Sequence, residues 1–319
     1  MGRPLALIVG LSACASIEEQ DTIDRSEGEE VAEGDAAEET GEAMSGEYPV
    51  TIESDAGETV LEAKPESIVS ISPSATEVLF AIGAGDQVVA VDSFSTTPEE
   101  APVTDLSGFD PNIEAIVAYE PDLVVASGDS NDLVASLGEL DIPVLVYGAP
   151  ADIEGGYAQM ADLGVATDHV DETAEVISGL REDVDTALAE APAEASPRVY
   201  HELDDTFFSA SSFGFVGSVY ADLGATNIAD EADTDESGFP QLTEEFIIEA
   251  DPQVIVITDQ VGYTAEDVAA RPGWDEITAV QEGNIITVNA DIASRWGPRL
   301  PQFIEAAAQA LDAAAVPVG

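Results

Sequence analysis

A segment that occurs twice constrains the fold of this chain more than any other feature. Residues 112–127 read NIEAIVAYEPDLVVAS, and residues 243–258 read TEEFIIEADPQVIVIT. A constant offset superposes Glu114 on Glu245 and, further along, the proline of one segment on the proline of the other. Each copy has the pattern of a helix, a turn marked by proline and a buried strand. The repetition therefore predicts two similar α/β lobes.

The residues around the two copies extend the same pattern. Short runs rich in β-branched residues alternate with helical stretches over residues 67–146 and again over residues 198–288. Such alternation is typical of βα units around a mostly parallel sheet. A weaker echo, LFAIGA at residues 79–84 and YADLGA at residues 220–225, supports the duplication. The predicted fold class is α/β, with two similar lobes whose sheets are mostly parallel.

One long linker helix is predicted between the lobes. Its apolar residues recur mostly three, four or seven apart and form one stripe: Val170, Ala174, Ile177, Val184 and Leu188. We place this helix at residues 168–191, stopped by Pro192, which corresponds to a rod of roughly 35 Å. The N-terminal lobe then covers residues 48–167 and the C-terminal lobe residues 192–319. A rigid connection limits hinge motion between lobes; the alternative is an ordinary surface helix inside one large domain.

The first residues resemble a lipoprotein signal. Arg3 precedes an apolar run at residues 4–13 that is too short to span a bilayer as a helix. Leu11-Ser12-Ala13-Cys14 resembles the lipobox, at which such a signal is cleaved to leave a lipidated cysteine. We therefore assign residues 1–14 to the signal and Cys14 to lipidation, and we expect the natural start upstream because the run is short. The alternative is a buried N-terminal strand with an incidental cysteine.

An acidic tether is predicted directly after the cysteine. Residues 15–47 are almost entirely Glu, Asp, Gly, Ala, Ser and Thr. Such a segment cannot bury enough apolar surface to fold, so it remains solvated. A lipidated cysteine followed by a tether predicts an extracytoplasmic protein, anchored by lipid to the membrane at the cell surface or in the periplasm.

The charge balance excludes one class of partner. The chain has 66 Asp and Glu residues against 8 Lys and Arg residues, for a formal net charge of -58. Nucleic acid is excluded because binding a polyanion needs a basic surface. So acidic a surface repels itself least in concentrated salt, which indicates adaptation to a saline environment.

The sequence gives little support to catalysis. The histidines are His169 and His201, and a hydrolase would need a nucleophile, a base and an orienting group. Glu202 and Asp204 lie near His201, but such neighbours are expected by chance in an acidic chain. No phosphate loop, dinucleotide fingerprint, nucleophile elbow or zinc-spaced cluster occurs. We therefore expect no enzyme, no catalytic residue, no metal site and no cofactor beyond a bound ligand, with a hydrolase as the remote alternative.

Three stretches of the chain carry a family resemblance. They are ISPSATE at residues 71–77, NIEAI through PDLV at residues 112–124, and RWGPR at residues 295–299. In this order, with the linker helix between them, they resemble the helical-backbone class of ABC-transporter substrate-binding proteins. That class serves importers of ferric siderophores, haem and cobalamin, and the resemblance, over roughly residues 67–311, is strongest to its cobalamin-binding branch.

The resemblance implies capture and delivery of a ligand by a monomer. A corrinoid such as cobalamin would be captured between the lobes and handed to an ABC permease powered by its ATPase. In the family, one glutamate on each lobe docks onto arginines of the permease, and the matching positions are Glu114 and Glu245. The internal repeat superposes the same two residues, which is an independent reason to single them out.

The resemblance also assigns the ligand contacts. Aromatic positions of the cobalamin branch match Phe94, Phe239 and, less closely, Phe109, while polar contacts match Asp291 and Arg295. A corrin ring offers apolar faces to aromatic side chains, and its rim amides need donors and acceptors. A ferric siderophore is the alternative, with Arg198, Arg295 and Arg299 as its cations. Haem is another, with an iron ligand among Tyr147, Tyr200, His201 and Tyr263.

Overall fold

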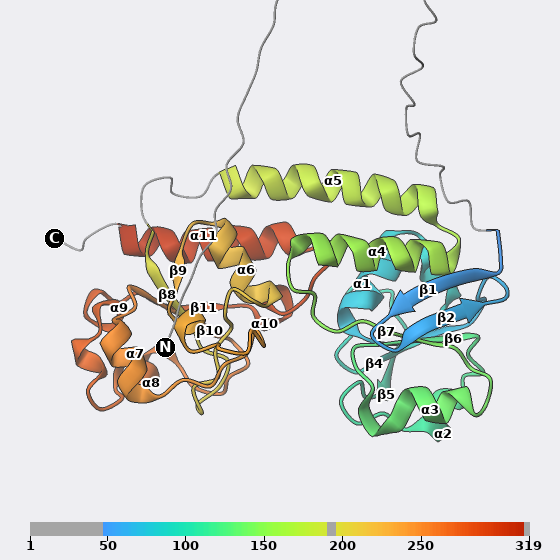
Figure 1. Ribbon diagram of the computed structural model, residues 1–319, viewed down its shortest axis with the longest axis horizontal. Helices are drawn as coiled ribbons and strands as arrows, with labels where there is room; N and C mark the ends of the chain where they lie inside the picture. Colours follow the sequence, from blue (N-terminus) through green and yellow to red (C-terminus); the bar gives the residue numbers. More distant parts are fainter. Residues whose placement is uncertain (1–46, 190–195, 316–319) are drawn as a thin grey trace, which may run out of the picture. The chain divides into compact units, whose positions relative to one another are not determined.

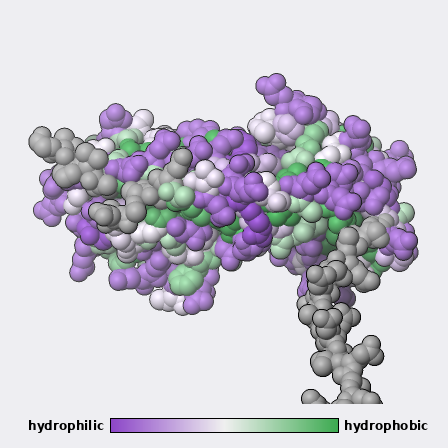
Figure 2. Space-filling model, turned by 90° about the horizontal axis from the view of Figure 1, so that it is seen from above, coloured by the Kyte–Doolittle hydropathy of each residue, from purple (hydrophilic) through white to green (hydrophobic). Residues whose placement is uncertain are grey.

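The computed structural model describes residues 47–189 and 196–315. The predicted signal with Cys14, nearly all of the predicted tether, and Pro192 lie outside the described residues. No helix of the described ranges combines the length and apolar character that crossing a membrane requires. Figure 2 shows a face on which hydrophilic residues predominate, as the acidic composition leads one to expect.

The first lobe contains a five-stranded parallel sheet with the order β5-β4-β3-β6-β7. Its central strands do not alternate between apolar and polar residues, because helices cover both faces of such a sheet and bury both sets of side chains. A hairpin of β1 and β2 lies beside edge strand β7, where the amide of Asp55 donates to the carbonyl of Val146 at 2.9 Å. The strands are β1 (Val50–Ser54), β2 (Gly57–Leu61), β3 (Ile68–Ile71), β4 (Val88–Asp92), β5 (Val103–Leu106), β6 (Leu123–Ala126) and β7 (Val144–Val146).

The second lobe repeats this sheet with one strand fewer. Its order is β11-β10-β8-β9, and all pairs are parallel (Figure 1). The strands are β8 (Arg198–His201), β9 (Thr226–Asn227), β10 (Val254–Thr258) and β11 (Ile285–Val288). The predicted fold class, two α/β lobes with mostly parallel sheets, is therefore confirmed.

The sequence repeat is also a repeat of register. Ile68 of β3 faces Leu123 of β6, and Val199 of β8 faces Val254 of β10, so both pairs obey the offset of the sequence repeat. The turn before each second strand contains a residue with left-handed φ, 50° at Glu120 in one copy and 48° in the other. The two lobes therefore share local backbone geometry as well as topology.

The repeated helices begin in the same way. Asn112 caps α2 (Ile113–Val117) by accepting from the amide three residues on, and Thr243 caps α7 (Glu244–Ala250) likewise. Side-chain caps of this kind satisfy one of the amides that lack a partner in the first turn. The caps place Glu114 and Glu245 in corresponding first turns, where both side chains are exposed.

Three long helices frame the sheets. Helix α5 (Val170–Ala189) packs against both α4 (Ile153–Thr167) and α11 (Leu300–Ala315), as Figure 1 shows. The predicted linker helix corresponds to α5, but it begins two residues later than expected. The reason is Asp168, whose φ of 60° ends α4 in a left-handed cap and separates the two helices.

The remaining helices are short and surround the sheets. They are α1 (Pro73–Ala81), α3 (Leu133–Gly138), α6 (Phe215–Asp222), α8 (Ala265–Ala269), α9 (Thr278–Glu282) and α10 (Ala290–Ala293), with 3₁₀ turns at Ala84–Gln87, Ser130–Asp132, Ile228–Glu231 and Trp274–Glu276.

Successive residues of the central strands belong to different cores. Leu123 of β6 and Val254 of β10 join one large cluster that also includes buried residues of α1, α4, α5, α6 and α11. Val124 belongs to a separate cluster on the other face of the first sheet, and Ile255 to one on the other face of the second. The two lobes therefore share one hydrophobic core, and each lobe also has a second core formed by its own residues alone.

Candidate ligand-binding site

Exposed phenylalanines gather at the carboxyl ends of the parallel strands. Of the 10 phenylalanines, five are exposed, and all five lie in loops that follow strands or connect them to the next helix: Phe94, Phe109, Phe208, Phe213 and Phe239. Burying a phenylalanine is worth about 1.5–3 kcal/mol, so leaving several exposed at one type of position is costly unless a partner covers them. In open α/β sheets ligands bind at this edge.

Phe94 and Phe109 form an exposed aromatic pair on the first lobe. Phe94 follows β4 and is 46% exposed, while Phe109 follows β5 and is 78% exposed. Their ring centroids are 5.5 Å apart at an interplanar angle of 87°, an edge-to-face arrangement. The structure thus brings together two of the three aromatic residues that the resemblance assigns to the ligand.

Asp92 organises the loop that carries Phe94. Its carboxylate accepts from Ser95 Oγ at 2.5 Å, and Thr76 Oγ1 lies 3.0 Å from the same hydroxyl. Burial raises the pKa of Asp92, and hydrogen bonds from the side chain and amide of Ser95 and from the amide of Gly108 oppose that rise. One carboxylate therefore contacts both phenylalanine loops.

Gly108 allows the second loop to approach the sheet. A Cβ at this position would overlap the carbonyl oxygen of Ile71. We expect Gly108→Ala to destabilise the protein by about 1–3 kcal/mol, because the loop must move to relieve the overlap. Phe109 would move with it, so ligand affinity should fall about tenfold in a titration. Gly128→Ala, at a position with open space, is the matched control, and equal affinity losses in both variants would contradict this role.

Phe239 lies on the second lobe in a loop held by a buried carboxylate. Asp233 accepts from Ser211 Oγ, from the amide and hydroxyl of Ser237, and from the amide of Gly238. These bonds outweigh burial and hold the pKa of Asp233 below its usual value. The side chain of Phe239 itself remains 45% exposed. The loop is thus fixed while its aromatic ring faces outward.

The phenylalanines after β8 have divided roles. Phe208 and Phe213 are exposed, whereas Phe215 is buried at the start of α6. Phe207 packs on Trp274, with the Arg271 guanidinium 5.5 Å from its ring centroid. Two of the four therefore extend the exposed aromatic surface, and two belong to the interior of the lobe.

Arg295 and Asp291 are placed beside Phe94, but they contact protein groups. Arg295 is 7% exposed; its Nη1 donates to Glu77 at 3.0 Å, and its Nη2 donates to Asp291 at 2.8 Å and to the carbonyl of Phe94 at 2.9 Å. Arg299 also bonds to Glu77. Glu77 is the residue that the sequence interpretation missed. The sequence contained a signal for it, since Glu77 is the one charged residue of helix α1.

Every cationic side chain of residues 47–189 and 196–315 forms an ion pair with a carboxylate. These six Lys and Arg residues lie within 4 Å of an acidic oxygen, and the pairs are Lys64–Asp168, Arg181–Glu154, Arg198–Asp251, Arg271–Glu202, Arg295–Glu77 and Arg299–Glu77. The described strand-end loops therefore offer no unpaired cation to an anionic ligand.

The side chains that could ligate haem iron are either buried or hydrogen-bonded to other residues. Tyr147, Tyr200 and His201 are buried, and His201 Nδ1 lies 2.9 Å from Tyr220 Oη. Tyr263 donates to Glu202 at 2.5 Å. His201 therefore has a structural partner. Among the described residues, no serine or threonine hydroxyl is hydrogen-bonded to its ring nitrogens, as a nucleophile of a hydrolase would be.

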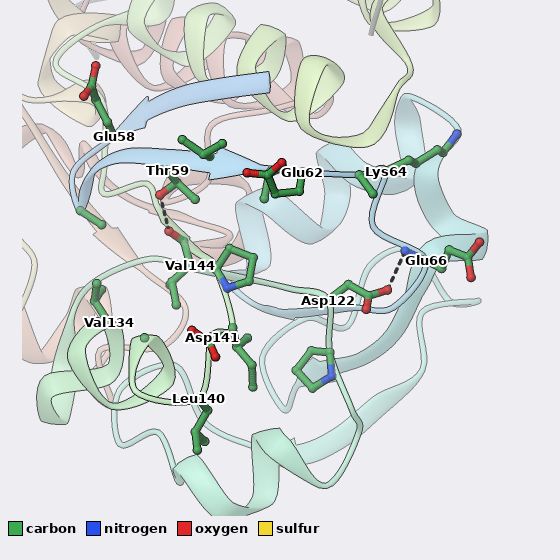
Figure 3. Close-up of a pocket in the computed structure, with 18 residues that line it drawn as sticks. Glu58, Thr59, Glu62, Lys64, Glu66, Asp122, Val134, Leu140, Asp141 and Val144 are labelled. Atoms are coloured by element: carbon green, nitrogen blue, oxygen red, sulfur yellow. Dashed lines mark hydrogen bonds between the residues drawn. The ribbon is translucent and has the colours of Figure 1, made fainter. Parts of the chain in front are cut away.

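A groove of about 950 Å³ lies on the first lobe, but at the wrong edge for this site (Figure 3). Of its lining residues, Asp122 and Pro143 come directly before β6 and β7, and Glu66 lies two residues before β3. The groove therefore lies at the amino ends of the strands, beneath β2, whereas the exposed phenylalanines lie at the carboxyl ends.

Fold and site together define a two-lobed binding protein, duplicated in topology, with an aromatic surface at the strand ends. In the described part of the chain every Lys and Arg side chain is paired with a carboxylate. The chain belongs to the periplasmic binding protein family, whose family model matches residues 68–292. The resemblance inferred from the sequence motifs is thereby confirmed.

Individual relatives differ in what they bind. A cobalamin-binding protein of Halobacterium salinarum is 34% identical over 267 residues, which cover 79% of this chain and 71% of that protein. An ABC transporter substrate-binding lipoprotein of Bacillus subtilis is 29% identical over 275 residues, covering 83% and 86%. The apo structure of a periplasmic haem-binding protein of Roseiflexus has a TM-score of 0.69 at 23% identity, covering 78% and 99%. That last likeness shows the fold alone.

Proposed function

We propose that this chain is the extracytoplasmic substrate-binding protein of an ABC importer and that its ligand is a corrinoid such as cobalamin. The observation that carries the proposal is the set of exposed phenylalanines at the strand ends of both lobes. Large apolar ring faces pack favourably on such side chains. The 34% identity to a cobalamin-binding protein supports the same ligand.

The ion pairs favour a corrinoid over the alternatives. Ferric catecholates are anionic, and a site for them needs free cations, whereas all six described cations have carboxylate partners. Haem needs an iron ligand, and the four residues considered for that role are buried or hydrogen-bonded. The amides of a corrin rim need only neutral donors and acceptors.

The mechanism is capture followed by delivery, without chemistry on the ligand. Phe94, Phe109 and Phe239 cover the ring faces, and the lobes close only slightly because they share one core. The loaded protein docks on the permease through Glu114 and Glu245, and the ATPase of the importer drives release. The chain is an extracytoplasmic monomer, held at the membrane by lipid on Cys14; the lipoprotein of Bacillus subtilis supports this anchor.

Calorimetric titration tests the ligand. The chain from Gly46 onward, in molar salt, is titrated with cyanocobalamin, and we expect saturable binding of one ligand per chain at sub-micromolar Kd, about -8 kcal/mol or stronger. Haemin and a ferric catecholate serve as competing ligands and should bind at least about a hundredfold more weakly. Tight binding of either competitor, with no heat from cyanocobalamin in folded protein, would exclude the corrinoid assignment and retain the transport role.

A further inference from the structure

We propose that Glu77 is a positioning residue of the ligand site and acts on Phe94 through Arg295. This inference rests on the proposed function, in which the side chain of Phe94 contacts the ligand. Glu77 lies on α1 and is almost fully buried, so it acts at a distance from any ligand.

One carboxylate holds two guanidinium groups. Glu77 Oε1 accepts from Arg295 Nη1 at 3.0 Å and from Arg299 Nη2 at 2.6 Å, while Oε2 accepts from Arg299 Nε at 2.8 Å. Both guanidinium groups thus share one oxygen and lie close together. Without the negative charge of Glu77, two largely buried cations would face each other, and at least one would have to move.

The consequence reaches Phe94 through Arg295. The second nitrogen of Arg295, Nη2, donates to the carbonyl of Phe94 at 2.9 Å and to Asp291 at 2.8 Å. The next residue, Ser95, is fixed independently by Asp92 and Thr76. The backbone of the loop is therefore fixed by two sets of contacts. Glu77 keeps Arg295 in the position from which it donates to the carbonyl of Phe94.

The same contacts join parts of the chain that lie far apart in sequence. Arg295 and Arg299 follow α10 of the second lobe, while Glu77 and Phe94 belong to the first. Between the arginines, Trp296 lies next to Gly156 of α4, and Gly297 lies next to Val78 of α1. The segment Arg295–Arg299 therefore connects the second lobe to the loop of the first lobe that carries Phe94.

A double-mutant cycle tests this path. Cyanocobalamin affinity is measured for the wild type, Glu77→Gln, Phe94→Ala and the double variant, all in molar salt. We expect Glu77→Gln alone to raise Kd about tenfold, mainly through faster dissociation, and to add less than about twofold in the Phe94→Ala background. Glu77→Asp, which keeps the charge, should recover most of the affinity. Additive effects of the two substitutions would overturn the proposal, since a residue acting through Phe94 cannot add to its removal.

Two further measurements keep the outcome decisive. If Glu77→Gln does not fold, the charge-balanced pair Glu77→Gln with Arg299→Met replaces it, with Arg299→Met alone as reference. In ligand-free protein, hydrogen exchange of the Thr96 amide, which donates to the same Phe94 carbonyl as Arg295, should be about tenfold faster in Glu77→Gln than in Glu154→Gln, a control that removes an exposed ion pair. An unchanged exchange rate in Glu77→Gln would overturn the proposal. If the wild-type protein does not bind cyanocobalamin, the proposed ligand is refuted instead.

Discussion

Exchanging both Glu114 and Glu245 for lysine is expected to abolish uptake while leaving ligand affinity within about twofold of the wild type. Both side chains are exposed in the first turns of corresponding helices, so the substitutions disturb no buried contact. Like charges brought together at an interface cost several kcal/mol, which corresponds to a loss of about two orders of magnitude or more in docking. Uptake of labelled cobalamin by cells carrying the variant, with Kd measured on the purified protein, checks both parts.

The control pair for that experiment is Glu172→Lys with Glu266→Lys. These residues are also exposed in first turns, of α5 and α8, and the substitutions change the net charge equally. If docking depends on position and not on total charge, the control takes up cobalamin at nearly the wild-type rate. Equal loss in both double variants, or weakened ligand binding in the Glu114 and Glu245 variant, would contradict the docking assignment.

Acidification from pH 7 to pH 4.5 is expected to remove about 2 kcal/mol of stability through His201 alone. Burial lowers the pKa of His201 to about 4, whereas the unfolded chain has a pKa of about 6.5 at this residue. Between these values the unfolded state binds more protons than the folded state, so the free energy of unfolding falls as pH falls. His201→Gln lacks this proton uptake and should have a correspondingly flatter profile in denaturant unfolding.

Asp162 acts with the opposite sign in the same range. Burial raises the pKa of its carboxyl to about 6, so the folded state binds the extra proton between about pH 6 and pH 4 and gains stability there. The contribution is smaller because the side chain is only half-buried. Asp162→Asn should therefore lose stability more steeply on acidification than the wild type. Parallel profiles for the wild type and His201→Gln would show that His201 does not dominate the acid limb.

The repeated pattern made the fold largely predictable. Alternating runs and the internal repeat predict two similar lobes with mostly parallel sheets, and the structure shows that each copy pairs its strand in the same register, as at Ile68 with Leu123 and Val199 with Val254. The start of the linker helix was less predictable. It depends on the left-handed conformation of Asp168, and the spacing of apolar residues in the helix does not predict that conformation.

The family resemblance, and not the local pattern, singled out Phe94, Phe109 and Phe239. The structure places all three in loops at the edge where the parallel strands end. The partner of Arg295 could not be predicted, because Glu77 is 218 residues away and nothing local links the two. The ligand role of Arg295 and Asp291 stays a prediction, and their observed hydrogen bonds add a structural role that the pattern did not reveal.

The shared core makes the two lobes depend on each other for their folding. Each lobe has the topology of an independent domain, yet residues such as Leu123 and Val254 complete a single interior together with α4, α5 and α11. Either half expressed alone would expose this apolar face to water. We therefore expect the chain to unfold in a single cooperative step, without a populated state in which one lobe is folded and the other is not.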